Sequence, residues 1–224
     1  MHHLRKILAI VAKDLAAELR TREMLGAMFV FALLVILIFN FAFELRAENQ
    51  RILAPGVLWV AITFSGMLGL SRSFIREKDR GSLEGLLLAP VDRGVIFLGK
   101  MLGNALFIAV IALIILPVFV ILFNLPAAVM PQLAIIAILG TIGLSGVGTL
   151  FSAMAVHTRA REVLLPVLLF PLIVPVILSA VKLSAAAIDN LPFAEAQQWF
   201  SLLVVFDIVF AMLSFLFFDY VVEE

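Results

Sequence analysis

Residues 24–43 read MLGAMFVFALLVILIFNFAF, a run of twenty residues without a single charged side chain. The hydrocarbon core of a bilayer is about 30 Å thick, and an α-helix needs roughly 20 apolar residues to cross it. This stretch therefore predicts a transmembrane helix and sets the scale on which the rest of the chain is interpreted.

Similar apolar runs recur along the whole chain. We expect membrane spans at about 24–43, 52–71, 101–123, 132–156, 163–181 and 200–222. The apolar runs are continuous and do not alternate with polar residues, which argues against membrane strands. The sequence thus predicts an all-α integral membrane protein, with residues 1–224 forming one transmembrane domain of six helices and no soluble domain.

The composition agrees with this fold class. Apolar residues make up 64% of the 224 residues and charged residues 14%, whereas ordinary globular domains have about 45–50% and about 25%. A soluble enzyme, a disordered tail and a nucleic-acid-binding module are therefore excluded. The chain has no cysteine, so disulfides, thiolate metal sites and thiol nucleophiles are excluded too.

The first 23 residues are expected to form an amphipathic helix that lies in the membrane interface. Charged residues separate apolar ones that recur at helical spacing, namely Leu4, Ile7, Leu8, Val11, Leu15 and Leu19. The alternative is a soluble helix that leans on a partner protein.

The basic residues predict the orientation of the spans. Thirteen Lys and Arg residues lie before span one, between spans two and three, or between spans four and five, and three lie on the other side. The positive-inside rule places the larger group, and with it both termini, in the cytoplasm. The largest inner loop is then 72–100, and the outer loops are 44–51, 124–131 and 182–199.

The inner loop 72–100 carries a charged run followed by a short apolar segment. Ser82 can cap a short helix whose first turn contains Glu84, and Pro90 ends it. Leu83, Leu86 and Leu87 would share one face. Such a helix can dock in a groove of another protein, or the loop can be a plain connector at the membrane surface.

Two features inside the spans are candidate functional elements. Asp207 lies well inside span six, where a charged residue costs about 2.5–3.5 kcal/mol at the helix centre, so it should face protein or be protonated. It would contact cargo or a gating partner, or else hydrogen-bond Asn104, Asn40 or a hydroxyl group.

Span five contains Pro166, Pro171 and Pro175, which predict kinks or a broken helix. A kinked or broken span could line a substrate path, and the alternative is a re-entrant pair of half-helices near the outer face. In span four, the small residues Ala137, Thr141, Ser145, Thr149 and Ala153 favour close helix packing within the chain over a dimer interface.

Residues 76–90, REKDRGSLEGLLLAP, resemble the coupling loop of the ABC-2 type permeases. The residues that match the pattern are Glu77, Gly81, Ser82, Leu83, Glu84, Pro90 and Arg93. The stretch 53–60, which includes Trp59, together with the six spans and the length, resembles more closely the haem exporter protein B (CcmB) family of the cytochrome c maturation system.

This resemblance implies a permease subunit that binds no ATP itself, and the sequence has no G-x-x-x-x-G-K-[ST] loop. A separate CcmA-like ATPase subunit would dock on the loop and on the amino-terminal helix, with two copies of each subunit. The residues implied in this coupling are Glu77, Arg80, Gly81, Ser82, Leu83, Glu84, Leu86, Leu87, Pro90 and Arg93.

The resemblance also implies a bacterial inner-membrane location, other cytochrome c maturation membrane proteins as partners, and haem as cargo. Trp59, Asp207 and the three prolines are the candidates for a substrate path or gate. No metal or haem ligand is assigned, because His157 is expected in an inner loop beside Arg159 and Arg161. The rival functions are an ABC-2 permease for a lipid-linked glycan or drug, and a scaffold that transmits ATPase work without moving haem.

Overall fold

A computed structural model of the chain describes residues 2–44, 47–79, 85, 91–156 and 161–222. The described elements are helical throughout. They are α1 (His2–Thr21), α2 (Glu23–Glu44), α3 (Ala47–Asp79), α5 (Arg93–Leu122), the short 3-10 helix η1 (Ala127–Val129), α6 (Met130–Ala155), α7 (Arg161–Ile188) and α8 (Phe193–Val222).

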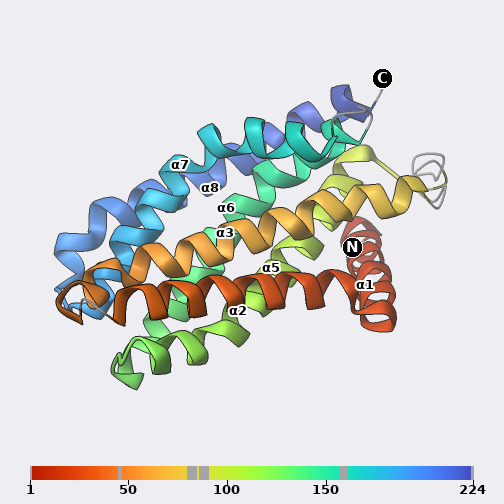
Figure 1. Cartoon of the computed structure of the whole chain (residues 1–224). Helices are drawn as coiled ribbons and strands as arrows, with labels where there is room; N and C mark the ends of the chain where they lie inside the picture. The colour runs from red at the N-terminus through yellow and green to blue at the C-terminus, as the bar shows by residue number, and fades with distance from the viewer. Residues whose placement is uncertain (1, 45–46, 80–84, 86–90, 157–160, 223–224) are drawn as a thin grey trace.

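Six of these helices, α2, α3, α5, α6, α7 and α8, are long and apolar enough to cross a membrane. They run side by side along the bundle, and α1 crosses the end of the bundle (Figure 1). The predicted all-α fold with six spans and a separate amphipathic helix in front of them is confirmed.

The spans differ from their predicted bounds mainly at their ends. Helix α7 continues to Ile188 and α8 begins at Phe193, so the turn between them is much shorter than the outer loop 182–199 expected from hydropathy. Helices α3 and α5 also extend beyond the apolar windows. Hydropathy marks the apolar part of a helix, whereas backbone hydrogen bonding carries the helix onward through polar residues.

Helix α7 is one continuous helix with Pro166, Pro171 and Pro175 inside it. The expectation of a re-entrant pair of half-helices near the outer face is therefore wrong. Prolines are tolerated in the interior of membrane helices because neighbouring helices and local adjustments of the backbone satisfy the groups that proline frees.

Helix α6 lies in the middle of the bundle and packs against α3, α5, α7 and α8. Its glycines allow this close approach: a Cβ on Gly140 would overlap the ring of Trp59, and one on Gly148 would overlap Leu70. Thr141, Ser145, Thr149 and Ala153 are buried on the same helix. The small residues of span four thus serve packing within the chain, as expected.

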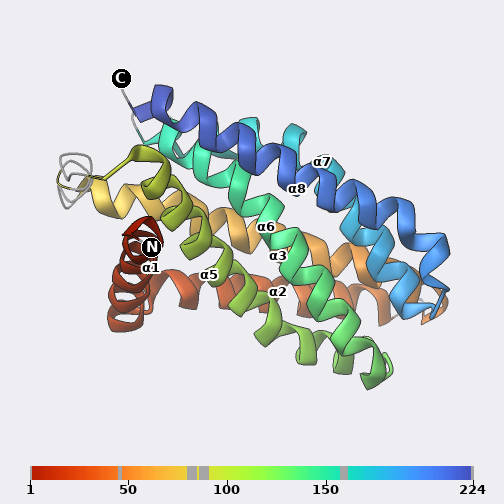
Figure 2. The ribbon, with the colours of Figure 1, turned by 180° about the vertical axis from the view of Figure 1, so that it is seen from behind.

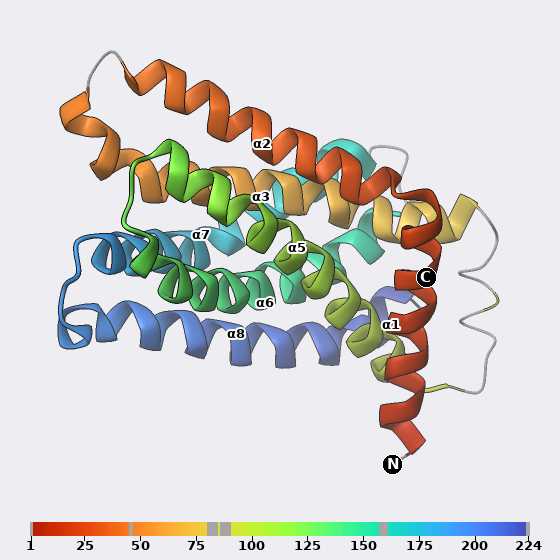
Figure 3. The same cartoon turned by 90° about the horizontal axis from the view of Figure 1, so that it is seen from below.

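Both chain ends lie at one end of the bundle, which Figure 2 shows from behind. We call this the α1 end: it holds α1, the last turns of α3 and α8, and the first turns of α5. Seen from below in Figure 3, α1 runs across this end from α2 toward the beginning of α5.

Candidate functional site

A buried ion pair joins α1 to α5 at the α1 end. Lys100 Nζ lies 2.8 Å from Asp14 Oδ2, and only 2% of the Lys100 side chain is exposed. The ammonium group also lies 5.5 Å from the centroid of the Phe74 ring, on α3. A buried ammonium is stable only with such compensation, because removing it from water costs several kcal/mol. The α1–α5 ion pair therefore fixes where α1 crosses the bundle.

The backbone of α5 is shaped for this contact by glycine. A Cβ on Gly99 would lie 2.9 Å from the Cβ of Ile10, and the corresponding position on Gly103 lies 3.8 Å from Asp14 Oδ2. Small residues let two helices approach closely, so Gly99 and Gly103 bring Asp14 within reach of Lys100.

The turn between α1 and α2 is also fixed. Glu18 is 1% exposed, and its Oε1 accepts hydrogen bonds from the backbone N–H groups of Met24 at 2.8 Å and Leu25 at 2.9 Å. A carboxylate at this position satisfies the free N–H groups of the first turn of α2 and complements the helix dipole. Arg22, between the helices, has φ of 55°, which turns the chain sharply.

Most of the predicted coupling residues lie outside the residues that the structure describes. This holds for Arg80, Gly81, Ser82, Leu83, Glu84, Leu86, Leu87 and Pro90, for the side chain of Glu77, and also for His157. Their role remains a prediction. The two flanking helices are described, and α3 ends and α5 begins at the α1 end (Figure 1).

Arg93, the last of the predicted coupling residues, begins α5. Its Nη1 donates a hydrogen bond to the backbone oxygen of Asp219, at 3.3 Å, near the end of α8. Arg93 thus ties the start of α5 to the carbonyl end of α8, where a positive charge complements the helix dipole.

Several polar side chains inside the bundle have partners. Asn104 Nδ2 donates to Thr149 Oγ1 at 2.9 Å, and Asn40 Nδ2 donates to the backbone oxygen of Leu122 at 2.7 Å. Ser152 Oγ donates to the backbone oxygen of Leu70 at 2.6 Å. These bonds join α5 to α6, α2 to α5 and α6 to α3, and they stabilise the packing of the spans.

Trp59 is buried at the junction of α3, α6 and α7. Its Nε1 donates to Ser184 Oγ at 3.0 Å, its ring lies against Gly140, and 2% of the residue is exposed. In this conformation Trp59 fills the space between three spans, and its part in a substrate path stays a prediction.

Asp207 lies among α6, α7 and α8 and is 8% exposed. Its Oδ1 has no hydrogen-bond partner among the described residues. The carboxyl group faces Gly143, where an added Cβ would collide with Oδ1 and would lie 3.0 Å from Val176. Asp207 Oδ1 receives no hydrogen bond from Asn104 or Asn40, whose amides donate to Thr149 and to the Leu122 backbone.

The α1–α5 ion pair and the Glu18 cap escaped the sequence analysis. Hydropathy treats charged residues of an amphipathic helix as its solvated face. The usable signal was the spacing of Ile10, Asp14 and Glu18, which recur every four residues and therefore share one face. Lys100, just before an apolar span, was counted only as a loop charge.

The six apolar helices and their buried polar contacts define a multi-pass α-helical membrane protein. The CcmB protein family matches residues 5–222, and the chain therefore belongs to the CcmB family. Its relatives include the heme exporter protein B of Pseudomonas aeruginosa, 28% identical over 190 residues that cover 85% of each chain.

Two further relatives are also called heme exporter protein B. The heme exporter protein B of Paracoccus denitrificans is 32% identical over 184 residues, which cover 81% of this chain and 84% of the relative. That of Haemophilus influenzae is 30% identical over 187 residues, which cover 83% and 84%. The similarity thus extends over most of the chain.

Proposed function

We propose that this chain is the membrane permease subunit of an ABC transporter that exports or delivers haem for c-type cytochrome biogenesis in the bacterial inner membrane. The observation that carries the proposal is the match of the CcmB family to residues 5–222. Relatives named heme exporter protein B, similar over most of their length, support haem as the cargo.

A separate ATPase subunit would supply the energy, with two copies of each subunit in the complex. It would dock on the loop 72–100 and on α1, since the loop has the coupling pattern and its flanking helices meet α1 at the same end. An ATPase that moved the loop would act on α3 and α5 directly. Helix α1 would follow α5, because the α1–α5 ion pair and the Glu18 cap join α1 to both neighbours.

Such a transmission needs two conformations with different contacts to the ATPase. The described conformation is one of them, with α5, α6 and α3 joined by the hydrogen bonds of Asn104 and Ser152. Relative movement of packed spans is the form in which ATP-driven work would reach the cargo.

Docking of the ATPase is tested by charge reversal in the loop. We expect Glu77→Lys or Glu84→Lys to abolish co-purification of the ATPase subunit while membrane insertion stays normal. Glu195→Lys, at the exposed start of α8 on the opposite end of the bundle, is the matched control and should co-purify normally. Normal co-purification of both loop variants would contradict the coupling role.

The cargo is tested in vesicles that hold only this chain and its ATPase. We expect ATP-dependent movement of haem across the vesicle membrane. If haem does not move, although ATPase activity is still needed for cytochrome c assembly in cells, the chain is a scaffold and the transport proposal is wrong.

A further inference from the structure

A pocket of about 640 Å³ lies at the α1 end, beside the contact between Arg93 and Asp219. It is formed where the start of α1, the start of α5 and the last turns of α8 meet. Its volume lies within the range of about 300–1,000 Å³ that is typical of small-molecule sites. The side chains that matter for its chemistry are Ile7, Leu98, Phe215, His3, Asp92 and Arg93.

One side of the pocket is apolar and flat. The ring of Phe215 lies directly against the backbone of Gly94, where an added Cβ would overlap the ring. Phe97 supports Phe215 in an edge arrangement, with 6.4 Å between the ring centroids. Phe215 is 40% exposed and lines the pocket, so part of its ring is accessible to a ligand.

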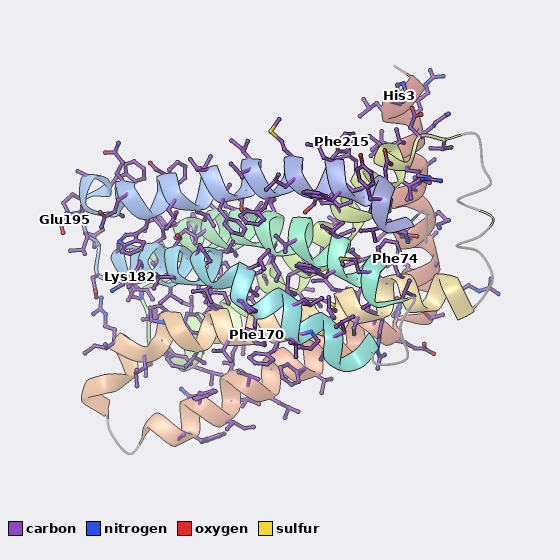
Figure 4. The ribbon with its side chains drawn as sticks, turned by 90° about the horizontal axis from the view of Figure 1, so that it is seen from above. His3, Phe74, Phe170, Lys182, Glu195 and Phe215 are labelled. Atoms are coloured by element: carbon purple, nitrogen blue, oxygen red, sulfur yellow. The ribbon has the colours of Figure 1, made fainter. Side chains whose placement is uncertain are left out.

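The polar side of the pocket holds an imidazole with a carboxylate behind it. His3 Nδ1 lies 3.6 Å from Asp92 Oδ2, and the two side chains are 67% and 76% exposed. This distance is too long for a hydrogen bond, but the carboxylate lies on the Nδ1 side of the ring, and the other nitrogen, Nε2, is the one that could bind a metal. Figure 4 shows His3 on α1 and Phe215 on α8 at the same end of the bundle.

We propose that this pocket is a haem-binding site in which His3 Nε2 is the axial ligand of the iron and Phe215 stacks on the porphyrin. This proposal rests on the proposed function, since it takes the cargo to be haem. The proposal specifies where the chain first binds haem. The site lies at the end of the bundle that is predicted to be cytoplasmic, and haem would bind there before it enters the bundle.

The described residues can supply the one protein ligand that haem needs, but not the several that a free metal ion needs. A free metal ion needs several protein ligands, and the described residues contain no group of three His, Cys, Asp or Glu side chains that could hold one. Haem needs one, because the porphyrin supplies four nitrogens to the iron.

The pocket also adjoins the α1–α5 ion pair. Ile7 lines the pocket on the same helix as Asp14, and Leu98 lies two residues from Lys100. Haem bound to His3 would therefore contact the two helices that the ATPase is proposed to move.

The test is a titration of the full-length chain, purified in detergent with a carboxy-terminal tag free of histidine, with ferric haem. We expect saturable binding of one haem per chain, with the absorption spectrum of imidazole-ligated iron. His3→Ala should weaken binding by at least about tenfold and remove that spectrum, and Asp92→Asn should weaken it about tenfold.

His2→Ala is the matched control, because it removes the neighbouring imidazole and should leave the spectrum unchanged. Free imidazole added to His3→Ala should restore the ligated spectrum. Phe215→Ala should weaken binding of iron-free protoporphyrin, which cannot be ligated, whereas His3→Ala should leave that binding intact.

The proposal is overturned if wild-type chain binds no more haem than empty micelles do, if His3→Ala binds like wild type, or if His2→Ala has the same effect as His3→Ala. These outcomes are separate from the proposed function, which depends on ATPase co-purification and haem movement in vesicles. A chain that passed those assays without binding haem at His3 would retain the proposed function and lose this site.

Discussion

Lys100 and Asp207 are both charged residues buried in apolar helices, yet their surroundings differ. Lys100, on α5 at the α1 end, lies 2.8 Å from the Asp14 carboxylate and close to the Phe74 ring. Asp207, deeper in the bundle among α6, α7 and α8, has an Oδ1 atom without a hydrogen-bond partner among the described residues. Lys100 is therefore paired with an opposite charge, whereas Asp207 Oδ1 has no partner among the described residues.

The difference in partners indicates that Lys100 and Asp207 contribute differently to the stability of the fold. The compensated pair holds α1 against α5, so its removal should damage the fold. An uncompensated buried polar atom costs about 1–3 kcal/mol, so Asp207 does not contribute to the stability of this conformation through that atom. A contact of Asp207 with cargo or with a gating partner remains a prediction.

The largest expected effect is that of Lys100→Met. Removing one partner of a buried ion pair costs about 3–5 kcal/mol, although Asp14 keeps Lys13, whose Nζ lies 3.3 Å from Asp14 Oδ1, as a second partner. We expect a large fall in the midpoint of thermal unfolding in detergent, followed by circular dichroism. Lys182→Met, at an exposed lysine on α7, is the control and should unfold like wild type.

The double variant Asp14→Leu with Lys100→Met sharpens this test. It removes both charges, so it should recover most of the stability lost in Lys100→Met. A double variant that is less stable than both single variants would show that the two residues do not act as a pair.

The second effect concerns the packing around Asp207. Gly143→Ala would place a Cβ against Asp207 Oδ1 and 3.0 Å from Val176, and overpacking of this kind costs about 1–3 kcal/mol. We expect a lower unfolding midpoint that Asp207→Ala partly restores by making room. Gly26→Ala, on α2 with no atom within 4 Å of the added Cβ, is the matched control and should not destabilise the chain.

How far the fold followed from the sequence is clear from α2 and α7. The run 24–43 alone predicted α2 almost to its ends, because an uninterrupted apolar helix must match the thickness of the bilayer. The three prolines of α7 suggested a broken helix, although α7 is continuous. Whether a proline breaks a membrane helix depends on the neighbouring helices, which the sequence does not specify.

At the candidate site, too, the sequence did not specify contacts between helices that are far apart in the chain. Hydropathy singled out Asp207, since an acid within an apolar span is conspicuous by itself. The Asp14–Lys100 contact joins residues 86 positions apart in sequence. It depends on the angle at which α1 crosses α5, so local pattern could supply only the shared face of Ile10, Asp14 and Glu18.

A smaller effect on stability is expected from the loss of a hydrogen bond between two uncharged side chains. The hydrogen bond from Asn104 to Thr149, 2.9 Å long, joins two apolar helices, where such bonds average about 0.6 kcal/mol. A double-mutant cycle with Asn104→Ala and Thr149→Val should give a coupling energy of that size in thermal unfolding. A coupling energy near zero would mean that the bond is not formed in detergent.

The smallest expected effect on stability, and the sharpest test of the comparison, is that of Asp207→Asn. This change keeps the shape of the side chain and removes its charge, and a buried oxygen without a partner has no hydrogen bond to lose. We expect the free energy of unfolding to be unchanged or slightly higher. Asp14→Asn makes the identical chemical change at the compensated site, and should be strongly destabilising because Lys100 loses its counterion.

Asp207→Asn, which should leave the stability of the chain unchanged, is expected to impair its function. If Asp207 acts in another state, Asp207→Asn should fold and bind the ATPase normally but fail to support cytochrome c maturation in cells. A fall in stability close to that of Asp14→Asn would show instead that Asp207 is compensated in the membrane. Normal maturation with Asp207→Asn would show that the transport cycle does not need the carboxyl group of this residue.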